Sequence, residues 1–228
     1  MQRVLVRSAG SAGPEVEVVA FRLERRPGDL AALDDAERER AERFVFALHR
    51  DRFIAGRAML RGVLGDRLGR QGRSLEMVSG PAGKPALADG AIEFNLSHTE
   101  DRAVLALGPP GRALGVDIEA QRPLSNRAAL AAVSFAPQER VDVEAEVDPD
   151  AAFYRVWSRK EAVIKALGAG VGYGLTRFRV SAGVRAQLLG FVDPRERLDA
   201  WTLESLDLGA EVAAALATRV LDTPGGLT

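Results

Sequence analysis

The spacing of hydrophobic and polar positions along this chain predicts short strands and longer helices in two successive groups. Residues 92–98, IEFNLSH, alternate strictly, and successive side chains of a strand point to opposite faces. Helical spacing predicts two helices between residues 33 and 69, the first beginning near Asp34 or Asp35. Strands are predicted at 3–6, 16–24, 92–98, 102–107, 113–120, 176–180, 185–192, 200–206 and 211–218, and further helices near 126–132, 136–144 and 151–167.

The order of these elements repeats, which indicates two related halves. The segment GPPGR at residues 108–112 interrupts the pattern, and FIAGRAMLRGVLG can be laid over VWSRKEAVIKALG with Arg57 against Lys160. The sequence therefore predicts an α+β fold of two similar pseudo-symmetric lobes, each with helices packed on a small, mainly antiparallel sheet, and an active site between them. We place residues 1–110 in the N-terminal lobe and residues 111–228 in the C-terminal lobe.

The segment VWSRKEAVIKALGAG, residues 156–170, carries charged side chains on a helix face that is otherwise apolar. At about 100° per residue, the centre of its apolar stripe falls on Lys160. Glu161 lies at the border of the stripe, and Lys165 lies beside it one turn on. Lys160 is either a snorkelling surface side chain or, as its central position favours, a side chain with a buried partner. Glu161 either pairs with Lys165 at i,i+4 or reaches a site on the sheet.

Composition limits the classes of function. The chain has 228 residues, of which 46% are hydrophobic, and its formal net charge of −1 gives no support for nucleic-acid binding. It has no cysteine, which excludes disulfides, thiolate metal sites and a cysteine nucleophile. No apolar run approaches a membrane span and the first residues lack a signal-peptide segment, so we expect a soluble cytoplasmic protein.

Lysine is rare among the 31 basic residues of the chain: only Lys84, Lys160 and Lys165 are lysines. A codon bias toward arginine accounts for the scarcity but not for the positions. Because an ammonium is a compact point charge and a guanidinium is a wide fork, each lysine is a candidate for a contact where the fork does not fit. Chance placement is the alternative.

Three carboxylates and a Ser–His pair are the candidate chemistry. Asp117 and Glu119 lie two apart in a predicted strand and share a face, which Glu161 can reach if its helix packs on the sheet. Paired carboxylates beside a substrate phosphate suit Mg²⁺, and the alternative is a solvated acidic face. Ser97 and His98 lie at a strand end, where ligand contact and a capping turn are both open. A serine hydrolase is not indicated, because the motif G-x-S-x-G is absent.

Two further segments add basic groups. GPAGKPAL places Lys84 in a Gly/Pro loop that lacks the spacing of a Walker loop, so a plain turn and a phosphate contact are both open. HRDRFIAGRAMLRGVLG contains four arginines in one helical region, of which we expect one or two to hold a phosphate: Arg50, Arg52, Arg57 and Arg61.

Five sequence blocks in order resemble the Sfp-type 4′-phosphopantetheinyl transferases: GKP, FNLSH, GVDIE, F-x-x-x-E from Phe135 to Glu139, and W-S-x-K-E-A-x-x-K-A-x-G-x-G. The resemblance extends from about residue 34 to residue 180. It implies a transferase that moves phosphopantetheine from coenzyme A to a serine of an apo acyl or peptidyl carrier protein and releases adenosine 3′,5′-bisphosphate. It also implies a monomer, and the two-lobed form of the family suggests secondary metabolism.

The resemblance further implies roles for individual residues. It implies Mg²⁺, with Mn²⁺ as a substitute, held by Asp117, Glu119 and Glu161, and a catalytic set of Glu161 as the base with Lys165 and Asp117. It implies coenzyme A phosphate contacts from Lys165, Lys84, Ser97 and His98, with a 3′-phosphate contact from Arg52 or Arg57 in the N-terminal lobe.

Two residues complete what the resemblance implies. We infer that Lys160 is structural and pairs with a buried acid or carbonyl. A basic pair that some members of the family carry near the first helix aligns approximately with residues 37–40, where Glu37 is a departure, so that contact is not assigned.

Two other classes of function compete with the transferase. A metal-dependent phosphohydrolase acting on a nucleotide pyrophosphate would use the same acids but release its product to water. A non-catalytic binding module would carry the acids as a solvated face. A transferase should also present a carrier-docking surface of apolar and arginine character, which we expect near residues 121–145.

Overall fold

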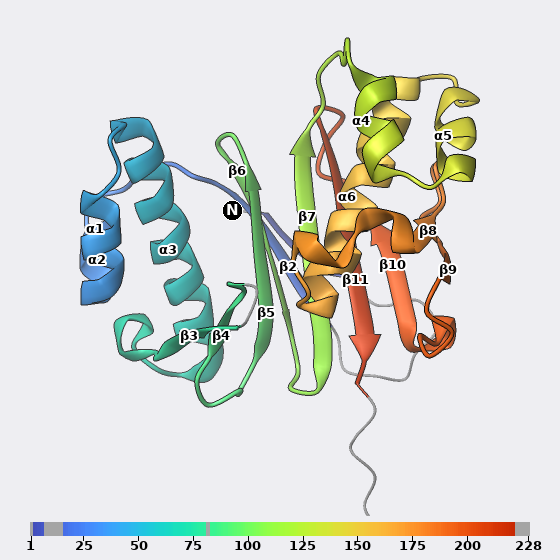
Figure 1. The fold of residues 1–228 in the computed structure, drawn as a ribbon. Helices are drawn as coiled ribbons and strands as arrows, with labels where there is room; N and C mark the ends of the chain where they lie inside the picture. Colours follow the sequence, from blue (N-terminus) through green and yellow to red (C-terminus); the bar gives the residue numbers. More distant parts are fainter. Residues whose placement is uncertain (1, 7–15, 81–82, 222–228) are drawn as a thin grey trace, which may run out of the picture.

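The computed structural model describes residues 2–6, 16–80 and 83–221, which form two successive groups of helices and strands (Figure 1). The first group contains β1 (Gln2–Val6), β2 (Val16–Arg22), α1 (Asp29–Ala32), α2 (Asp35–Glu42), α3 (Ala47–Leu68), β3 (Met77–Ser79), β4 (Pro85–Leu87), β5 (Glu93–Thr99) and β6 (Arg102–Gly108). The second contains β7 (Arg112–Ala120), α4 (Arg127–Ser134), α5 (Pro137–Glu144), α6 (Pro149–Leu167), β8 (Phe178–Val180), β9 (Leu188–Phe191), β10 (Trp201–Ser205) and β11 (Val212–Val220).

Two antiparallel sheets form the centre of the molecule. One has the strand order β1-β2-β6-β5 and the other the order β10-β11-β7, and β3-β4 and β8-β9 form two small hairpins. α3 lies outside the first sheet and α6 outside the second, so the layers run helix, sheet, sheet, helix (Figure 1). The mixed α+β class predicted from the sequence is confirmed.

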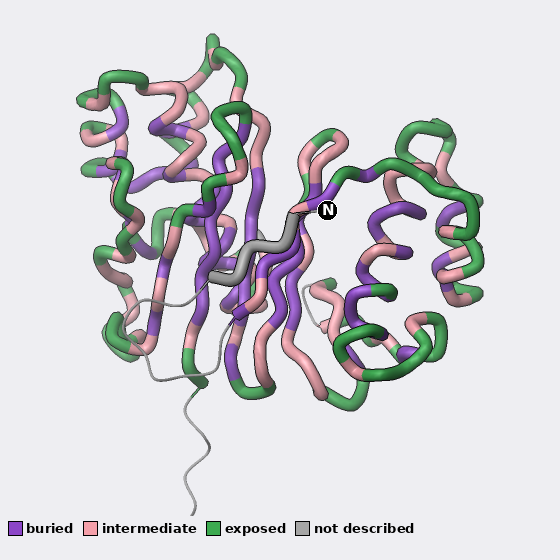
Figure 2. Tube along the Cα trace, turned by 180° about the vertical axis from the view of Figure 1, so that it is seen from behind, coloured by how far each residue is buried: buried purple, intermediate pink, exposed green. Residues whose placement is uncertain are grey.

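Apolar side chains fill each gap between these layers. One cluster joins α3 to the first sheet, a second joins the two sheets to each other, and a third joins the second sheet to α4, α5 and α6. Figure 2 shows this burial along the central strands and the inner sides of the helices. Representative residues are Leu60, Val63, Phe94 and Leu105 in the first cluster, Val18, Val104, Val116 and Leu216 in the second, and Phe153, Val163, Leu203 and Ala217 in the third.

The two halves share a strand plan and a buried ion pair. In β2-β6-β5 and in β7-β11-β10 alike, the last strand of the group lies between the other two. The third residue of α2, Glu37, is buried and pairs with Arg57 of α3, and the third residue of α5, Glu139, is buried and pairs with Lys160 of α6 at 2.9 Å. Each glutamate also accepts the backbone N–H of the residue that precedes its helix, Asp34 for Glu37 and Ala136 for Glu139. The alignment of Arg57 with Lys160 therefore has a physical basis.

The structure adds a few short elements to those predicted. α1 and the β3-β4 hairpin are not expected from the sequence, and each strand of that hairpin has only three residues. The strand predicted at 176–180 begins later, at Phe178, because residues 175–177 form a 3₁₀ turn. Residues 81–82 of the predicted Gly/Pro loop lie outside the described residues.

Candidate active site

The candidate site lies where the edge strands of the two sheets meet. β5 is the last strand of its sheet, β7 is the last strand of the other, and side chains of β5 bridge to the backbone of β7. Asn95 Oδ1 accepts the Val116 N–H at 2.8 Å, and Thr99 Oγ1 accepts the Ala120 N–H at 3.2 Å. Because alternate residues of a strand share a face, Ser97 between these two bridges also faces β7.

Ser97, Asp117 and Lys165 form a closed group at this seam. Lys165 Nζ donates to Asp117 Oδ1 at 2.6 Å and to Ser97 Oγ at 2.9 Å, and the Ser97 hydroxyl donates to Asp117 Oδ1 at 3.0 Å. Asp117 is 3% exposed, and its second oxygen, Oδ2, has no hydrogen-bond partner among the described residues. An orphaned carboxylate oxygen at a buried position is costly and indicates a site for a further ligand.

Gly115 lets α6 approach β7 closely enough to build this group. A Cβ atom at Gly115 would overlap the carbonyl oxygen of Ala162 and the amide nitrogen of Ala166. The helix therefore lies directly against the strand, and Glu161 and Lys165, one turn apart on α6, both face the Asp117 region. Lys165 pairs with Asp117, in contrast to the i,i+4 pair with Glu161 that was the alternative.

Glu119 and Glu161 lie beside Asp117 and are shifted by it. Burial raises the pKa of Glu119 to about 7, the charge of Asp117 adds to the shift, and the Trp157 N–H and Lys165 oppose it. Burial followed by the charge of Asp117 also raises the pKa of Glu161, with Lys165 opposing. The charges of the three carboxylates thus act on one another, and this repulsion favours a cation bound among them.

Metal-free protein should lose stability as these carboxyls ionise. The Glu119 carboxyl titrates near 4.5 when unfolded and at about 7 when folded, so between these values the folded state binds more protons. The unfolding free energy should therefore fall as pH rises through this window and stop falling above it. Thermal unfolding in chelator should show a shallower decline for Glu119→Gln than for wild type. Parallel pH curves for the two proteins would rule out this carboxyl as the source.

His98 lies on the other face of β5, close to basic groups from both halves. Partial desolvation lowers the pKa of His98, and the charges of Lys165 and Arg52 lower it further. Arg52 of α3 and Lys165 of α6 are therefore both near His98. The guanidinium of Arg52 forms no hydrogen bond or ion pair within residues 16–80 and 83–221, which leaves it available to a ligand.

Lys84 reaches the seam from the Gly/Pro loop. Its Nζ donates to the Leu114 carbonyl of β7 at 2.7 Å, and burial lowers the pKa of this ammonium, with Glu93 opposing. A partly desolvated lysine with one carbonyl partner keeps two N–H donors for other acceptors.

The structure does not bring Arg57 into this group. Its guanidinium pairs with the buried Glu37 and contacts Met77 Sδ at 3.1 Å. The same Glu37 carboxylate also receives Arg61 Nε at 2.5 Å, so it holds two arginines of α3. Of the two candidates for a 3′-phosphate contact, Arg52 is the one that lies near the other site residues.

Comparison with known proteins assigns the chain to a family. Residues 113–217 match the 4′-phosphopantetheinyl transferase superfamily, and residues 28–109 match the N-terminal domain of 4′-phosphopantetheinyl transferases. The L-aminoadipate-semialdehyde dehydrogenase-phosphopantetheinyl transferase of Xenopus laevis is 30% identical over 208 residues, which cover 82% of this chain and 68% of that protein. The chain belongs to the 4′-phosphopantetheinyl transferase superfamily.

Other members of this superfamily are more similar over shorter segments. The 4′-phosphopantetheinyl transferase HetI of Nostoc sp. is 40% identical over 150 residues, or 63% of either chain. A phosphopantetheinyl transferase of Thraustochytrium sp. is 37% identical over 163 residues, which cover 64% of this chain and 56% of that protein. The matches thus span less than two thirds of these two relatives. No described helix is long and apolar enough to cross a membrane.

Three residues of this transferase-family site were not assigned from the sequence. The sequence placed Trp157 only in the apolar stripe of its helix, but in the structure its Nε1 donates to Glu119 Oε1 at 3.1 Å. Asn95 counted only as polar, but it fixes β5 against β7. Glu139 is the buried partner inferred for Lys160, and that inference is confirmed, since Lys160 also donates to the carbonyls of Leu175 and Phe178 at 2.7 Å each.

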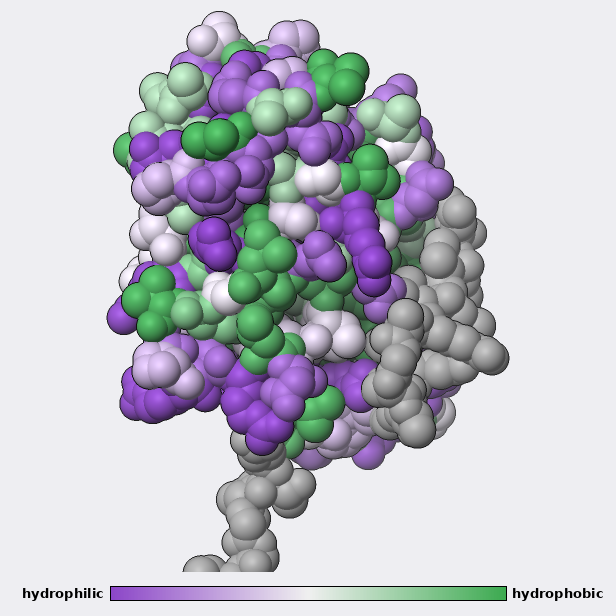
Figure 3. Space-filling view, turned by 90° about the vertical axis from the view of Figure 1, so that its right-hand side faces the viewer, coloured by the Kyte–Doolittle hydropathy of each residue, from purple (hydrophilic) through white to green (hydrophobic). Residues whose placement is uncertain are grey.

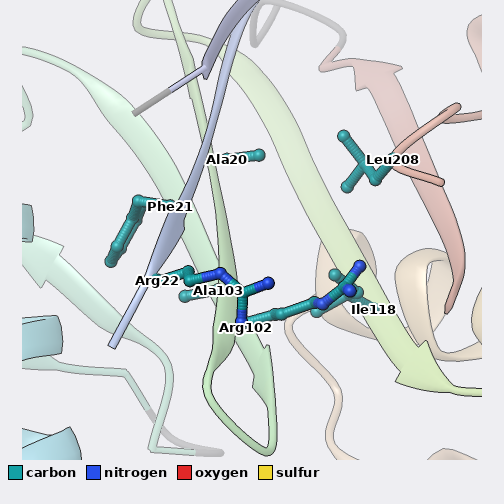
Figure 4. Close-up of a pocket in the computed structure, with 7 residues that line it drawn as sticks. All are labelled: Ala20, Phe21, Arg22, Arg102, Ala103, Ile118 and Leu208. Carbon is teal, nitrogen blue, oxygen red and sulfur yellow. The ribbon is translucent and has the colours of Figure 1, made fainter. Parts of the chain in front are cut away.

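A separate cavity of about 320 Å³ lies between the sheets and is lined by none of the predicted site residues. Figure 4 shows its lining, with Arg102 extending from β6 toward Ile118 of β7. Arg102 pairs with Glu211, and Arg22 at the same cavity pairs with Asp101. Because these arginines have carboxylate partners and no predicted site residue lines the cavity, we do not assign it to the phosphate site.

Proposed function

We propose that this chain transfers the 4′-phosphopantetheine moiety of coenzyme A to a serine of an apo acyl or peptidyl carrier protein and releases adenosine 3′,5′-bisphosphate. Family membership supports the reaction class. The observation that carries the assignment is the group at the seam, where Lys165 pairs with the buried Asp117 and the half-buried Glu119 and Glu161 lie within the electrostatic influence of both. Phosphoryl transfer from a pyrophosphate requires carboxylates that bind a cation and, beside them, basic side chains that bind the phosphates.

Coenzyme A should lie across the seam with its phosphates on basic groups from both halves. We assign Lys165, Lys84, Ser97 and His98 to phosphate contacts, and Arg52 to the 3′-phosphate. These side chains come from α3, the loop before β4, β5 and α6, so the two groups of elements act together. We propose the boundary between them near residue 110.

The acid set fits a divalent cation. Among residues 16–80 and 83–221, no three His, Cys, Asp or Glu side chains form a ready-made metal site, and Lys165 holds one oxygen of Asp117. The orphaned Oδ2 of Asp117 and the raised pKa values of Glu119 and Glu161 favour Mg²⁺ or Mn²⁺ held by these three residues. Such an ion, when bound, neutralises charge on the pyrophosphate oxygens.

Glu161 is our candidate for the general base. Burial raises the pKa of Glu161 toward neutral pH. A general base is most effective when its pKa lies near the pH at which the enzyme works. The carrier serine loses its proton to Glu161, its oxygen bonds to the β-phosphorus, and the bond from that phosphorus to the bridging oxygen breaks. Lys165 balances the negative charge that grows on the leaving bisphosphate.

The carrier protein should dock on the α4–α5 side. The predicted region at 121–145 contains α4 and α5, and it exposes two apolar side chains, Val133 and Val141. Figure 3 faces the side on which α5 lies and shows apolar side chains scattered among polar ones. Arg127 of this region pairs with Glu144 and Asp150, so it is less accessible than the sequence suggested. A cytoplasmic location, a monomer and secondary metabolism also remain predictions.

Release of adenosine 3′,5′-bisphosphate distinguishes the competing functions. Coenzyme A and Mg²⁺ are incubated with this protein and the nucleotide product is measured by chromatography, with apo carrier, without carrier, and with a carrier whose acceptor serine is alanine. A transferase releases the bisphosphate only with the intact apo carrier, in equal amount to the carrier consumed. Release in all three samples would favour the phosphohydrolase, and no release would favour a binding module.

A further inference from the structure

Trp157 of α6 makes the one directional contact to Glu119 that the described residues provide. Its indole Nε1 donates to Glu119 Oε1 at 3.1 Å, from a position one turn before Glu161 on the same helix. This contact joins the helix that carries Glu161 to the strand that carries Asp117 and Glu119. The contact thus ties together the two elements that supply the three carboxylates.

The indole ring is held from behind by an aromatic stack. Trp157 stacks on Phe153 with ring centres 5.8 Å apart and planes 21° apart, and Phe153 packs on the fully buried Phe135 at 4.9 Å. A ring fixed in this way presents its N–H in one direction. The hydrogen bond is therefore preorganised, and it restrains Glu119 without a large loss of side-chain entropy.

The chemistry of the donor matters as much as its position. Asp117 and Glu161 repel the Glu119 carboxylate, so it needs a partner to stay near them when it is ionised. An indole is a neutral donor with a single N–H, so it orients one oxygen and leaves the carboxylate charge intact. Lys165, by contrast, brings a positive charge to Asp117 and offsets that carboxylate. Glu119 forms no ion pair within the described residues, and the indole engages only its Oε1.

We propose that Trp157 is a positioning residue for Glu119, holding Oε1 so that Oε2 is presented to the divalent cation of the site. This inference rests on the proposed metal-dependent function. It predicts that the indole N–H sets the affinity for the cation, whereas the ring itself serves packing. Partners that orient metal ligands in this way are typically worth about 10- to 100-fold in metal affinity.

Trp157→Phe separates the hydrogen bond from the ring, because phenylalanine keeps the stack on Phe153 and removes the N–H. Trp201→Phe is the matched control: Trp201 is the only other tryptophan in the sequence, and its Nε1 is buried without a partner in the described part of the chain. Binding of Mn²⁺ to each full-length protein is measured from the electron paramagnetic resonance signal of free Mn²⁺, with and without coenzyme A. The midpoint of thermal unfolding is recorded for each variant.

We expect Trp157→Phe to bind Mn²⁺ at least about tenfold more weakly than wild type, and Trp201→Phe to bind it as wild type does. The KM for Mg²⁺ in the transfer reaction should rise with Trp157→Phe, while kcat at saturating Mg²⁺ stays close to wild type. Benzothienylalanine at position 157, which keeps the bicyclic ring without the N–H, should reproduce the phenylalanine result.

Several results would overturn the inference. Wild-type Mn²⁺ affinity in Trp157→Phe, or in the benzothienylalanine protein, would mean that the N–H does not position Glu119. An equal loss of affinity in Trp201→Phe would assign the effect to general packing. Because Mn²⁺ binding needs neither a carrier nor turnover, a wild-type protein that binds Mn²⁺ but modifies no carrier would contradict the transfer function and not this inference. A wild-type protein that binds no Mn²⁺ would overturn the metal site and this inference together.

Discussion

Glu161→Gln should keep the fold and lose most turnover, by about 10²- to 10⁴-fold in kcat at saturating Mg²⁺. Glutamine has nearly the same shape, but it cannot accept the serine proton or bring a negative charge to the cation. The partly buried Glu161 carboxylate is repelled by Asp117, so the neutral amide should leave the unfolding temperature unchanged or raise it. Initial rates of carrier modification and thermal unfolding of the same preparation measure the two effects.

A matched glutamate elsewhere checks that the loss is specific. Glu76 is exposed and lies directly before β3, outside the predicted site residues, and Glu76→Gln should transfer at the wild-type rate. Wild-type turnover in Glu161→Gln would remove Glu161 from the role of base. A large fall in its unfolding temperature would instead show that this carboxylate supports the fold, against the electrostatics described above.

Lys160→Met should destabilise the protein by about 3–5 kcal/mol, because it leaves the buried Glu139 carboxylate without its cation. Lys160 and Glu139 are essentially inaccessible to solvent, and Lys160 also donates to two backbone carbonyls beyond α6. Glu139 in turn accepts the backbone N–H of Ala136 and of Val180 at 2.7 and 2.8 Å. Removing the ammonium therefore affects α5, α6 and β8 together, and the unfolding temperature should fall by on the order of 10 °C.

A second substitution separates the loss of the pair from the loss of lysine alone. Glu139→Gln combined with Lys160→Met removes both charges and leaves no unpaired buried ion, so the double variant should be more stable than the sum of the single effects. Strict additivity, or a loss below about 1 kcal/mol for Lys160→Met, would show that this pair contributes little.

Helical and strand periodicity were enough to place the charged residues that later gather at the seam. The apolar stripe of residues 153–167 has its centre at Lys160, and the structure buries that side chain completely. Glu161 and Lys165 at the border of the stripe face the edge strand β7. Local geometry of this kind survives folding because tertiary packing selects a face of a helix without changing its 3.6-residue period.

Contacts between distant segments could not be predicted in this way. Lys84 meets the carbonyl of Leu114, 30 residues on, only because the loop before β4 lies against β7. The carboxylate of Glu37 is likewise held by Arg57 from a different helix. In both cases the partner follows from how the two groups of elements pack, which the periodicity of one segment does not contain.

Intact-protein mass spectrometry of apo carrier domains tests the central claim most directly. Several carrier types are incubated with this protein, coenzyme A and Mg²⁺, and the mass of each carrier is compared with parallel samples containing chelator or the Glu161→Gln variant. We predict a gain of one phosphopantetheine on at least one carrier, absent with chelator and with the variant. No gain on any carrier, while coenzyme A binds and stays intact, would contradict the proposed transfer, and coenzyme A consumed without a gain would establish hydrolysis instead.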